Sequence, residues 1–150
     1  MFGISPAGNI DNNQNGYLCA DIETWCSTPG YIDYIAPQVY WSFSHSWDQA
    51  RFDICTNNWA KLVTCDDVDL IIGMAPYRIG ESTSSDPDWG SRTDNMVRML
   101  NFTKTHAAVS GFIMFKYESI YASVYSSAYN TSTSYHVTEI GNMIPLIAEW

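Results

Sequence analysis

Apolar residues follow two alternating spacings along the chain, every second residue in short segments and every third or fourth in longer ones. The first spacing predicts strands at residues 2–5, 31–39, 69–75 and 111–115, and the second predicts helices at about 17–27, 49–63 and 92–106. Strands that alternate with helices are typical of βαβ units in a parallel sheet. We therefore expect an α/β domain of four strand–helix units, followed by a helical tail of the same domain at 121–150.

The second predicted strand changes character along its length. Ile32, Tyr34, Ala36, Gln38 and Tyr40 share one face, which is apolar at its start and ends on an amide and a phenol. Parallel strands of a barrel have this pattern, with hydrophobic core at the amino end and functional groups at the carboxyl end. A functional site is therefore expected where this strand ends.

Four strand–helix units correspond to half of an eight-stranded TIM barrel, which typically needs about 250 residues. Because residues 2–5 already have a strand pattern, we expect residues 1–150 to be the C-terminal half of a barrel, with the N-terminal half missing. The predicted fold is thus a partial TIM barrel with parallel strands. A small complete domain of the flavodoxin type is the alternative, but the phosphate-binding loop usual after its first strand is not seen.

Composition limits the class of partner. The chain has a formal net charge of −9 with only seven Lys and Arg, whereas nucleic acids and anionic membrane surfaces attract basic patches. No run of about eighteen apolar residues occurs, so no membrane span is predicted. Six Trp and ten Tyr provide flat amphipathic surfaces, which fit a neutral polar ligand such as a glycan.

The four Cys and three His lack the spacing of a metal site, and no metal or cofactor is expected. Cys19 and Cys26 fall on one predicted helix, two turns and about 10 Å apart, which is too far for a disulfide. We expect the cysteines to be buried free thiols.

Four segments in order carry a family resemblance: residues 2–6 (Phe-Gly-Ile-Ser-Pro) with Gly8, residues 31–41, residues 72–79 (Ile-Gly-Met-Ala-Pro-Tyr-Arg-Ile) and residues 111–119. Together they resemble the C-terminal half of the glycosyl hydrolase-like 10 domain family. The resemblance implies strands five to eight of a TIM barrel and glycoside hydrolysis, in some members of bacterial cell-wall glycan stripped of peptide. It also implies that the acidic cluster, at the end of the fourth strand, precedes this chain. The chain alone is thus expected to be inactive, and its parent protein to be exported.

Gln38 and Tyr40 are the strongest candidates for contact with a sugar, because they point the same way at a strand end. Tyr40 is the catalytic candidate and Gln38 a substrate-binding one, although a closed polar network would also satisfy a buried Gln. Trp41 and Tyr77 are expected to stack on sugar rings or to pack the loops.

Further candidates lie after the first and fourth predicted strands. Ser5 and Asn9 follow the first strand and are expected to line the same mouth. Glu118 is the preferred carboxylate for catalysis, because it follows the fourth strand. It could equally stabilise the start of the next helix, where negative charge is favourable.

The other carboxylates are weaker candidates for catalysis. Asp33 is near the start of its strand and is expected to have a structural role. Glu81, Asp86 and Asp88 fall in a long predicted loop, where we expect them to be solvated.

Two readings of a different class remain open. In the first, the chain is a carbohydrate-binding remnant without catalytic activity, because it keeps the aromatic residues and lacks the acidic cluster. In the second, two half barrels associate through their exposed edge strands.

Overall fold

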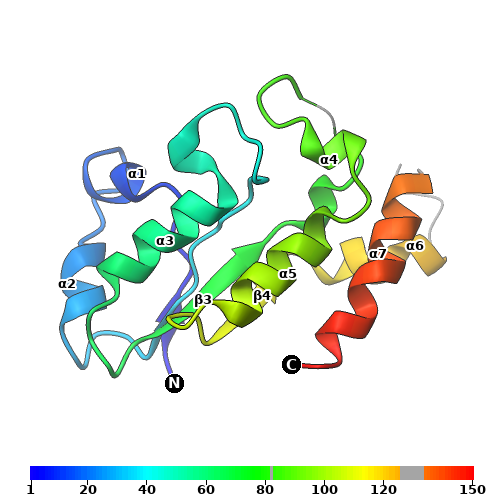
Figure 1. Cartoon of the computed structure of the whole chain (residues 1–150). Helices are drawn as coiled ribbons and strands as arrows, with labels where there is room; N and C mark the ends of the chain where they lie inside the picture. The colour runs from blue at the N-terminus through cyan, green and yellow to red at the C-terminus, as the bar shows by residue number, and fades with distance from the viewer. Residues whose placement is uncertain (82, 126–133) are drawn as a thin grey trace.

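The computed structural model describes residues 1–81, 83–125 and 134–150. Its strands are β1 (Gly3–Ile4), β2 (Tyr34–Ile35), β3 (Asp69–Met74) and β4 (Gly111–Met114). Its helices are α1 (Ile10–Gln14), α2 (Ile22–Ser27), α3 (Phe52–Leu62), α4 (Asp88–Ser91), α5 (Asn95–Thr105), α6 (Tyr117–Tyr125) and α7 (Ser134–Ile147), with short 3₁₀ turns η1 (Asp48–Ala50) and η2 (Pro76–Arg78). The strands form one parallel sheet in the order β1-β2-β3-β4. Figure 1 shows β3 with the helices α3 and α5 near it. The α/β class and the parallel sheet are confirmed.

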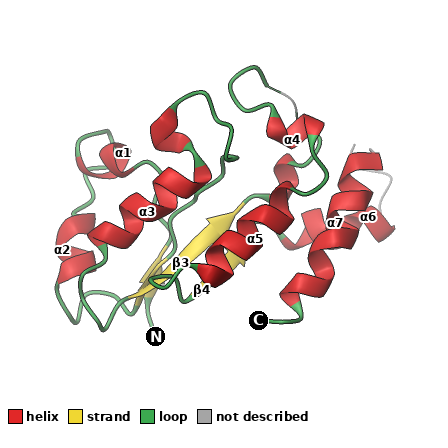
Figure 2. Cartoon of the chain, viewed as in Figure 1, coloured by secondary structure: helices red, strands yellow, loops and turns green. Residues whose placement is uncertain are grey.

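The strand order favours the partial barrel over the flavodoxin type. Parallel strands joined in sequence order by right-handed crossovers place their helices on one face of the sheet. Helix α3 contacts β3 and helix α5 contacts β4, and Figure 2 shows α5 in front of the strands. A flavodoxin-type sheet instead reverses its strand order at a switch point. The architecture is consistent with a partial barrel, and the numbering of the strands as five to eight stays a prediction.

The two faces of the sheet differ in what covers them. Leu70, Ile72 and Met74 of β3 are fully buried in the core, which also includes residues of α3 and α5. The opposite face contains Gly73, which is in register with Gln38 on one side and with Ile113 on the other. This register places Gln38 beside Gly73, on the face opposite to Leu70, Ile72 and Met74.

Helix α3 connects the core to the loop after β1. Phe52, Cys55 and Trp59 of this helix are buried, as its apolar spacing predicted, and each large side chain contributes about 2 kcal/mol through burial. The Trp59 indole Nε1 donates to the carbonyl of Gly8 at 2.7 Å. A side chain at position 8 would overlap the Gln38 carbonyl and approach the Trp41 ring to 2.8 Å, so this close approach requires glycine.

The first predicted helix begins later than its apolar spacing indicated. The Asp21 side chain accepts a hydrogen bond from the Thr24 amide and thereby caps α2, which starts at Ile22. Cys19 lies before this cap with a φ of 47°, and it is exposed. The expectation that Cys19 is a buried residue on the same helix as Cys26 is therefore wrong. The segment between the first predicted strand and this helix contains the short helix α1.

The tail is helical where the structure describes it. Helix α7 packs against α5, with Ile140 and Met143 buried between them and the rest of the core. Asn142 Nδ2 donates to the Thr93 carbonyl at 3.2 Å and adds a polar link to the same neighbour. None of the described helices combines the length and apolarity needed to cross a bilayer.

Candidate functional site

A hollow of about 270 Å³ opens where the strands end. The residues that surround it come from the loop after β1, the segment after β2 and η2, and they include Asn9, Gln38, Tyr40, Trp41, Tyr77 and Arg78. Five of the seven residues chosen from the sequence thus surround one space. They meet there because the carboxyl ends of neighbouring parallel strands lie on one side of a sheet.

Gln38 is held by contacts on both sides. Its side-chain Nε2 donates to the Ser5 carbonyl at 3.0 Å, and its backbone amide donates to the Pro6 carbonyl at 3.0 Å. The side-chain amide of Gln38 therefore has one hydrogen-bond partner within the protein. This agrees in part with the alternative that Gln38 belongs to a closed polar network. The Ser5 carbonyl thus contacts a residue of the hollow, whereas Ser5 itself lines a separate depression that also includes Gln38.

Three aromatic rings form a cluster at the ends of β2, β3 and β4. The ring centroids of Tyr40 and Tyr77 are 6.0 Å apart and edge to face, and Phe115 lies 6.2 Å from Tyr40 and 6.1 Å from Tyr77. Phe115 was not among the residues chosen from the sequence. Its position one residue beyond β4, on the same face as Ile113, is the signal that could have identified it.

Both phenols of this cluster are protonated at neutral pH. Burial raises the pKa of Tyr40 above its usual value, and the neighbouring Tyr77 phenol raises it further. Burial is also the main cause of the raised pKa of Tyr77. A neutral phenol donates a hydrogen bond and accepts another, which suits contact with a sugar hydroxyl.

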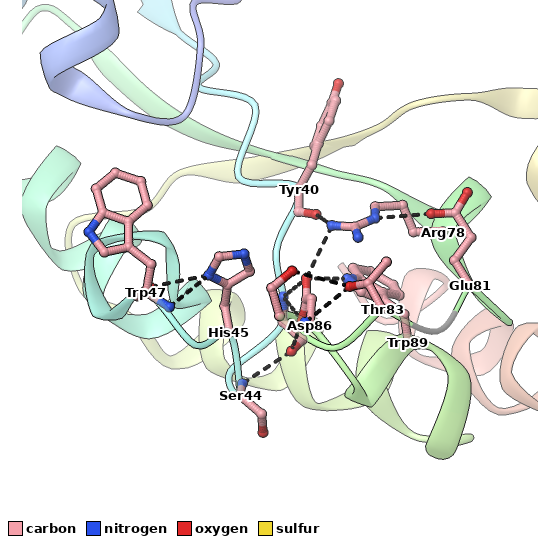
Figure 3. A network of polar contacts seen from close by, with 11 residues as sticks. Tyr40, Ser44, His45, Trp47, Arg78, Glu81, Thr83, Asp86 and Trp89 are labelled. Atoms are coloured by element: carbon pink, nitrogen blue, oxygen red, sulfur yellow. Dashed lines mark hydrogen bonds and ion pairs between the residues drawn. The ribbon is translucent and has the colours of Figure 1, made fainter.

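Arg78 ties the backbone at Tyr40 to a buried carboxylate (Figure 3). Its Nη1 donates to the Tyr40 carbonyl at 2.7 Å and lies 3.1 Å from Asp86 Oδ2, while its Nε lies 3.2 Å from Glu81 Oε2. The guanidinium also sits 5.5 Å from the centre of the Trp89 ring. Arg78 is thus fixed in one orientation at the edge of the hollow.

Asp86 is the centre of this network. Its carboxylate accepts hydrogen bonds from the Ser42 amide at 3.2 Å, from the Ser42 hydroxyl, from Arg78 and from the Trp89 indole at 2.9 Å. Only 1% of the residue is exposed, so the expectation of a solvated Asp86 is wrong. The burial follows from these donors, because a charged carboxylate is stable inside a protein only when it is fully paired.

Asp88 and Trp89 are buried as well. Asp88 accepts from the Ser44 hydroxyl at 2.9 Å and pairs with Arg98 at 3.2 Å, so it too differs from the solvated residue expected. Trp89 has no exposed surface and packs in the core. The segment that contains them is joined to the loop after β2 and is not a loose surface loop.

Comparisons with known proteins identify the family of this chain. The family model for "Glycosyl hydrolase-like 10" matches residues 1–91, which is more than half of the chain. The chain belongs to the glycosyl hydrolase-like 10 family. This confirms the resemblance drawn from the four sequence segments.

Curated relatives include "Glycosyl hydrolase DigH" of Escherichia coli K12, 34% identical over 129 residues, and "Glycosyl hydrolase YngK" of Bacillus subtilis 168, 32% identical over 133 residues. The alignments cover 77% and 79% of this chain. They cover only 29% and 25% of the relatives, so the chain spans less than a third of their length.

The part of the chain that matches the glycosyl hydrolase-like 10 model includes most of the site. Gln38, Tyr40, Tyr77 and Arg78 all lie within residues 1–91. Phe115 lies beyond the match and completes the aromatic cluster from β4.

The remaining candidates have defined local contacts. Glu118 lies in the first turn of α6, where its Oε2 is 2.6 Å from Lys116 Nζ and its side chain is 55% exposed. Asn9 is the N-cap of α1 and accepts from the Asp11 amide at 2.8 Å, while it also lines the hollow. Asp33 is at the amino end of β2 and pairs with the N-terminal ammonium group at 3.4 Å, the structural position expected.

In the part of the chain that the structure describes, no three His, Cys, Asp or Glu side chains gather into a group suited to a metal ion. The site as it stands offers phenols, amides and aromatic faces. These groups can bind and orient a polar ligand with apolar faces, such as a sugar.

Proposed function

We propose that this chain supplies the last four strands of a glycoside hydrolase barrel and that its hollow binds a bacterial cell-wall or related polysaccharide. The observation that supports this is the convergence of Gln38, Tyr40, Trp41 and Tyr77 around one hollow at the carboxyl ends of parallel strands. In barrels, that end holds the active site. Aromatic rings match the apolar faces of sugars, and the amide and phenols match the hydroxyls.

The general acid is proposed to come from outside this hollow. Hydrolysis of a glycosidic bond usually needs two carboxyl groups, and the described lining includes neither Asp nor Glu. The acid is therefore assigned to the preceding half of the barrel. Within this chain, we propose that Tyr40 donates a hydrogen bond to the reacting sugar. Glu118 is the proposed second carboxylate of the reaction.

The charge at the site favours a neutral glycan. Arg78 is the one cationic residue in the described lining, and Asp86 and Glu81 both pair with it. This leaves no unpaired positive charge for an acidic sugar, and the chain as a whole is at −9. A polysaccharide of N-acetylated sugars fits these groups.

Exposed apolar residues on the inner face support the half-barrel proposal. Ile113 and Phe115 are 44% and 53% exposed, although they lie on the face that a closed barrel would bury. In the proposed enzyme the missing strands cover them. The same residues favour a second candidate, in which two copies of the chain pair through this face.

The test is titration of the purified chain with a hexasaccharide of N-acetylglucosamine, together with an assay for new reducing ends. We expect binding without cleavage, and a loss of about tenfold in affinity for Tyr40→Ala, since one aromatic contact contributes on the order of 1 kcal/mol. Tyr31→Ala is the matched control, because Tyr31 is exposed near the start of the same strand. Absence of binding, or equal affinity of the Tyr40 variant, would exclude the hollow as a glycan site.

Two further outcomes separate the alternatives. Cleavage by the isolated chain would contradict the assignment of the acid to the other half, and binding without cleavage by the complete parent protein would favour a carbohydrate-binding remnant. Sedimentation velocity addresses pairing: a stable monomer at micromolar concentration excludes pairing as a requirement for folding.

A further inference from the structure

A second hollow, of about 200 Å³, adjoins the first. Gly8 and Asn9 line both, and the second is completed by side chains of α1, η1 and α3, among them Asp11, Gln49 and Asn58. The shared residues make the two hollows neighbours on the loop after β1. A ligand that occupies both hollows would pass over Gly8 and Asn9, the two residues that they share.

At the base of the second hollow, the polar groups around Gly8 are already hydrogen-bonded within the protein. The Gly8 carbonyl accepts from the Trp59 indole at 2.7 Å and from the Cys55 thiol at 3.2 Å. These two contacts use the acceptor capacity of the carbonyl and satisfy both donors. Burial raises the pKa of the Cys55 thiol to about 12, so the floor is uncharged. The residues available to contact a ligand are therefore those at the sides of the hollow.

The walls present an ordered pair of amides. Asn58 Nδ2 donates to Gln49 Oε1 at 3.1 Å, which orients both side chains. Gln49 Nε2 and Asn58 Oδ1 have no protein partner among the described residues, so one donor and one acceptor stand side by side. This pair matches a hydroxyl or an acetamido group, each of which both donates and accepts.

Charge narrows the class of ligand. Asp11 is the only charged residue in the described lining, and it is exposed in the first turn of α1. An anionic ligand would meet its carboxylate with no cation to compensate, whereas a sugar hydroxyl can donate to it.

We propose that this second hollow is a further sugar-binding subsite, which holds a neutral sugar of the same polysaccharide beyond the ring at Tyr40. Gln49 and Asn58 contact the hydroxyl or acetamido groups of that sugar. The inference rests on the proposed function, because it requires the first hollow to bind glycan.

The experiment compares the affinity of the chain for the disaccharide and the hexasaccharide of N-acetylglucosamine by calorimetry. The wild-type chain is expected to bind the hexasaccharide more tightly. Asn58→Ala and Gln49→Ala should each reduce that gain about three- to tenfold, the effect of one lost hydrogen bond, and leave disaccharide affinity unchanged. Asn57→Ala is the matched control, because Asn57 is exposed on the same helix and contacts Asp53 and His106 outside the hollow.

The outcomes distinguish the two proposals. If the wild-type chain binds both sugars equally, or if the Asn58 and Gln49 variants behave as Asn57→Ala does, the second subsite is excluded while the first hollow stands. If the wild-type chain binds neither sugar, the proposed function fails, and the subsite fails with it. Circular dichroism of each variant shows whether a smaller difference in affinity between the two sugars reflects unfolding.

Discussion

Arg78 donates a hydrogen bond from Nη1 to the carbonyl oxygen of Tyr40, with 2.7 Å between the two atoms. The two residues are 38 positions apart, and the contact joins η2 to the segment after β2. Because the carbonyl belongs to the residue whose ring faces the hollow, the orientation of Tyr40 depends on a guanidinium that is itself held by Asp86. The glycan contact proposed for Tyr40 therefore depends on the same interactions that hold Asp86 in the fold.

Loss of the Asp86 charge should destabilise the fold strongly. Asp86→Asn removes the negative charge that pairs with the half-buried Arg78. It also replaces the carboxylate that accepts from the Ser42 amide and the Trp89 indole. The free energy of unfolding should therefore fall by about 3 kcal/mol. Urea denaturation measures this change. Asp67→Asn, at an exposed position, should change it by less than about 0.5 kcal/mol, and equal effects of the two substitutions would contradict the role given to Asp86.

Arg78→Lys should weaken glycan binding more than it weakens the fold. A lysine keeps the charge beside Asp86 but cannot also donate to Glu81 and the Tyr40 carbonyl in a fixed fork. We expect affinity for the N-acetylglucosamine hexasaccharide to fall about three- to tenfold, with the melting temperature lowered by only a few degrees. Arg92→Lys, an exposed residue paired with Asp94, is the control in calorimetry. Unchanged affinity of the Arg78 variant would show that Tyr40 is positioned without it.

Glu139 should make the fold less stable as pH rises through the neutral range. Burial raises its pKa to about 7, and Asp94 contributes to the increase, although hydrogen bonds from the Met96 and Asn95 amides and the charge of Arg92 oppose it. Between about pH 4.5 and 7 the unfolded carboxyl is ionised while the folded one keeps its proton, so the unfolded state is favoured progressively. The loss amounts to at most about 3 kcal/mol and levels off above pH 7.

Glu139→Gln tests this pH dependence. Glutamine can still accept from the Met96 amide at the start of α5, but it does not ionise. Burial lowers the pKa of His136, and this group acts in the opposite direction in both proteins. Thermal melting from pH 5 to 8 should therefore show a melting temperature that, relative to the variant, falls with pH for the wild-type chain. Parallel curves would mean that the pH dependence comes from another group.

Removal of the Tyr40 hydroxyl should reduce turnover in the complete enzyme that carries this half barrel. Tyr40→Phe keeps the ring contacts with Tyr77 and Phe115 and deletes only the hydrogen-bonding group. We expect kcat to fall about tenfold to a hundredfold, with a smaller change in KM, since the proposed contact is made at the reacting sugar. Tyr31→Phe is the control in a steady-state assay, and unchanged kinetics would remove Tyr40 from the mechanism. Glu118→Gln, tested in the same assay, decides whether this carboxylate takes part.

Much of the site could be predicted from the chain because it follows from strand parity. Gln38 and Tyr40 are two positions apart beyond β2, which is shorter than the predicted strand at 31–39, and Gln38 is still in register with Gly73. A period of two is a local property of the backbone, and parallel strands place their carboxyl ends together, so local pattern was sufficient. The family membership rests on the same segments.

The contacts between the segment at Asp86 and the loop after β2 could not be predicted in this way. Asp86 and Asp88 follow a stretch of Ser, Thr and Gly that is typical of a solvated loop, yet both are buried by partners more than forty positions away, Ser42 and Ser44. Phe115 joins the aromatic cluster only because β4 lies beside β3.

The amino-acid sequence by itself determined the alternation of strands and helices, the face on which Gln38 and Tyr40 lie, and the family to which the chain belongs. The tertiary structure alone decided that Asp86 is a buried partner of Arg78, that Trp89 is core and that a second hollow adjoins the first. The physical reason is range: backbone periodicity acts between neighbours in the chain, whereas burial and charge pairing depend on which distant segments the fold brings into contact.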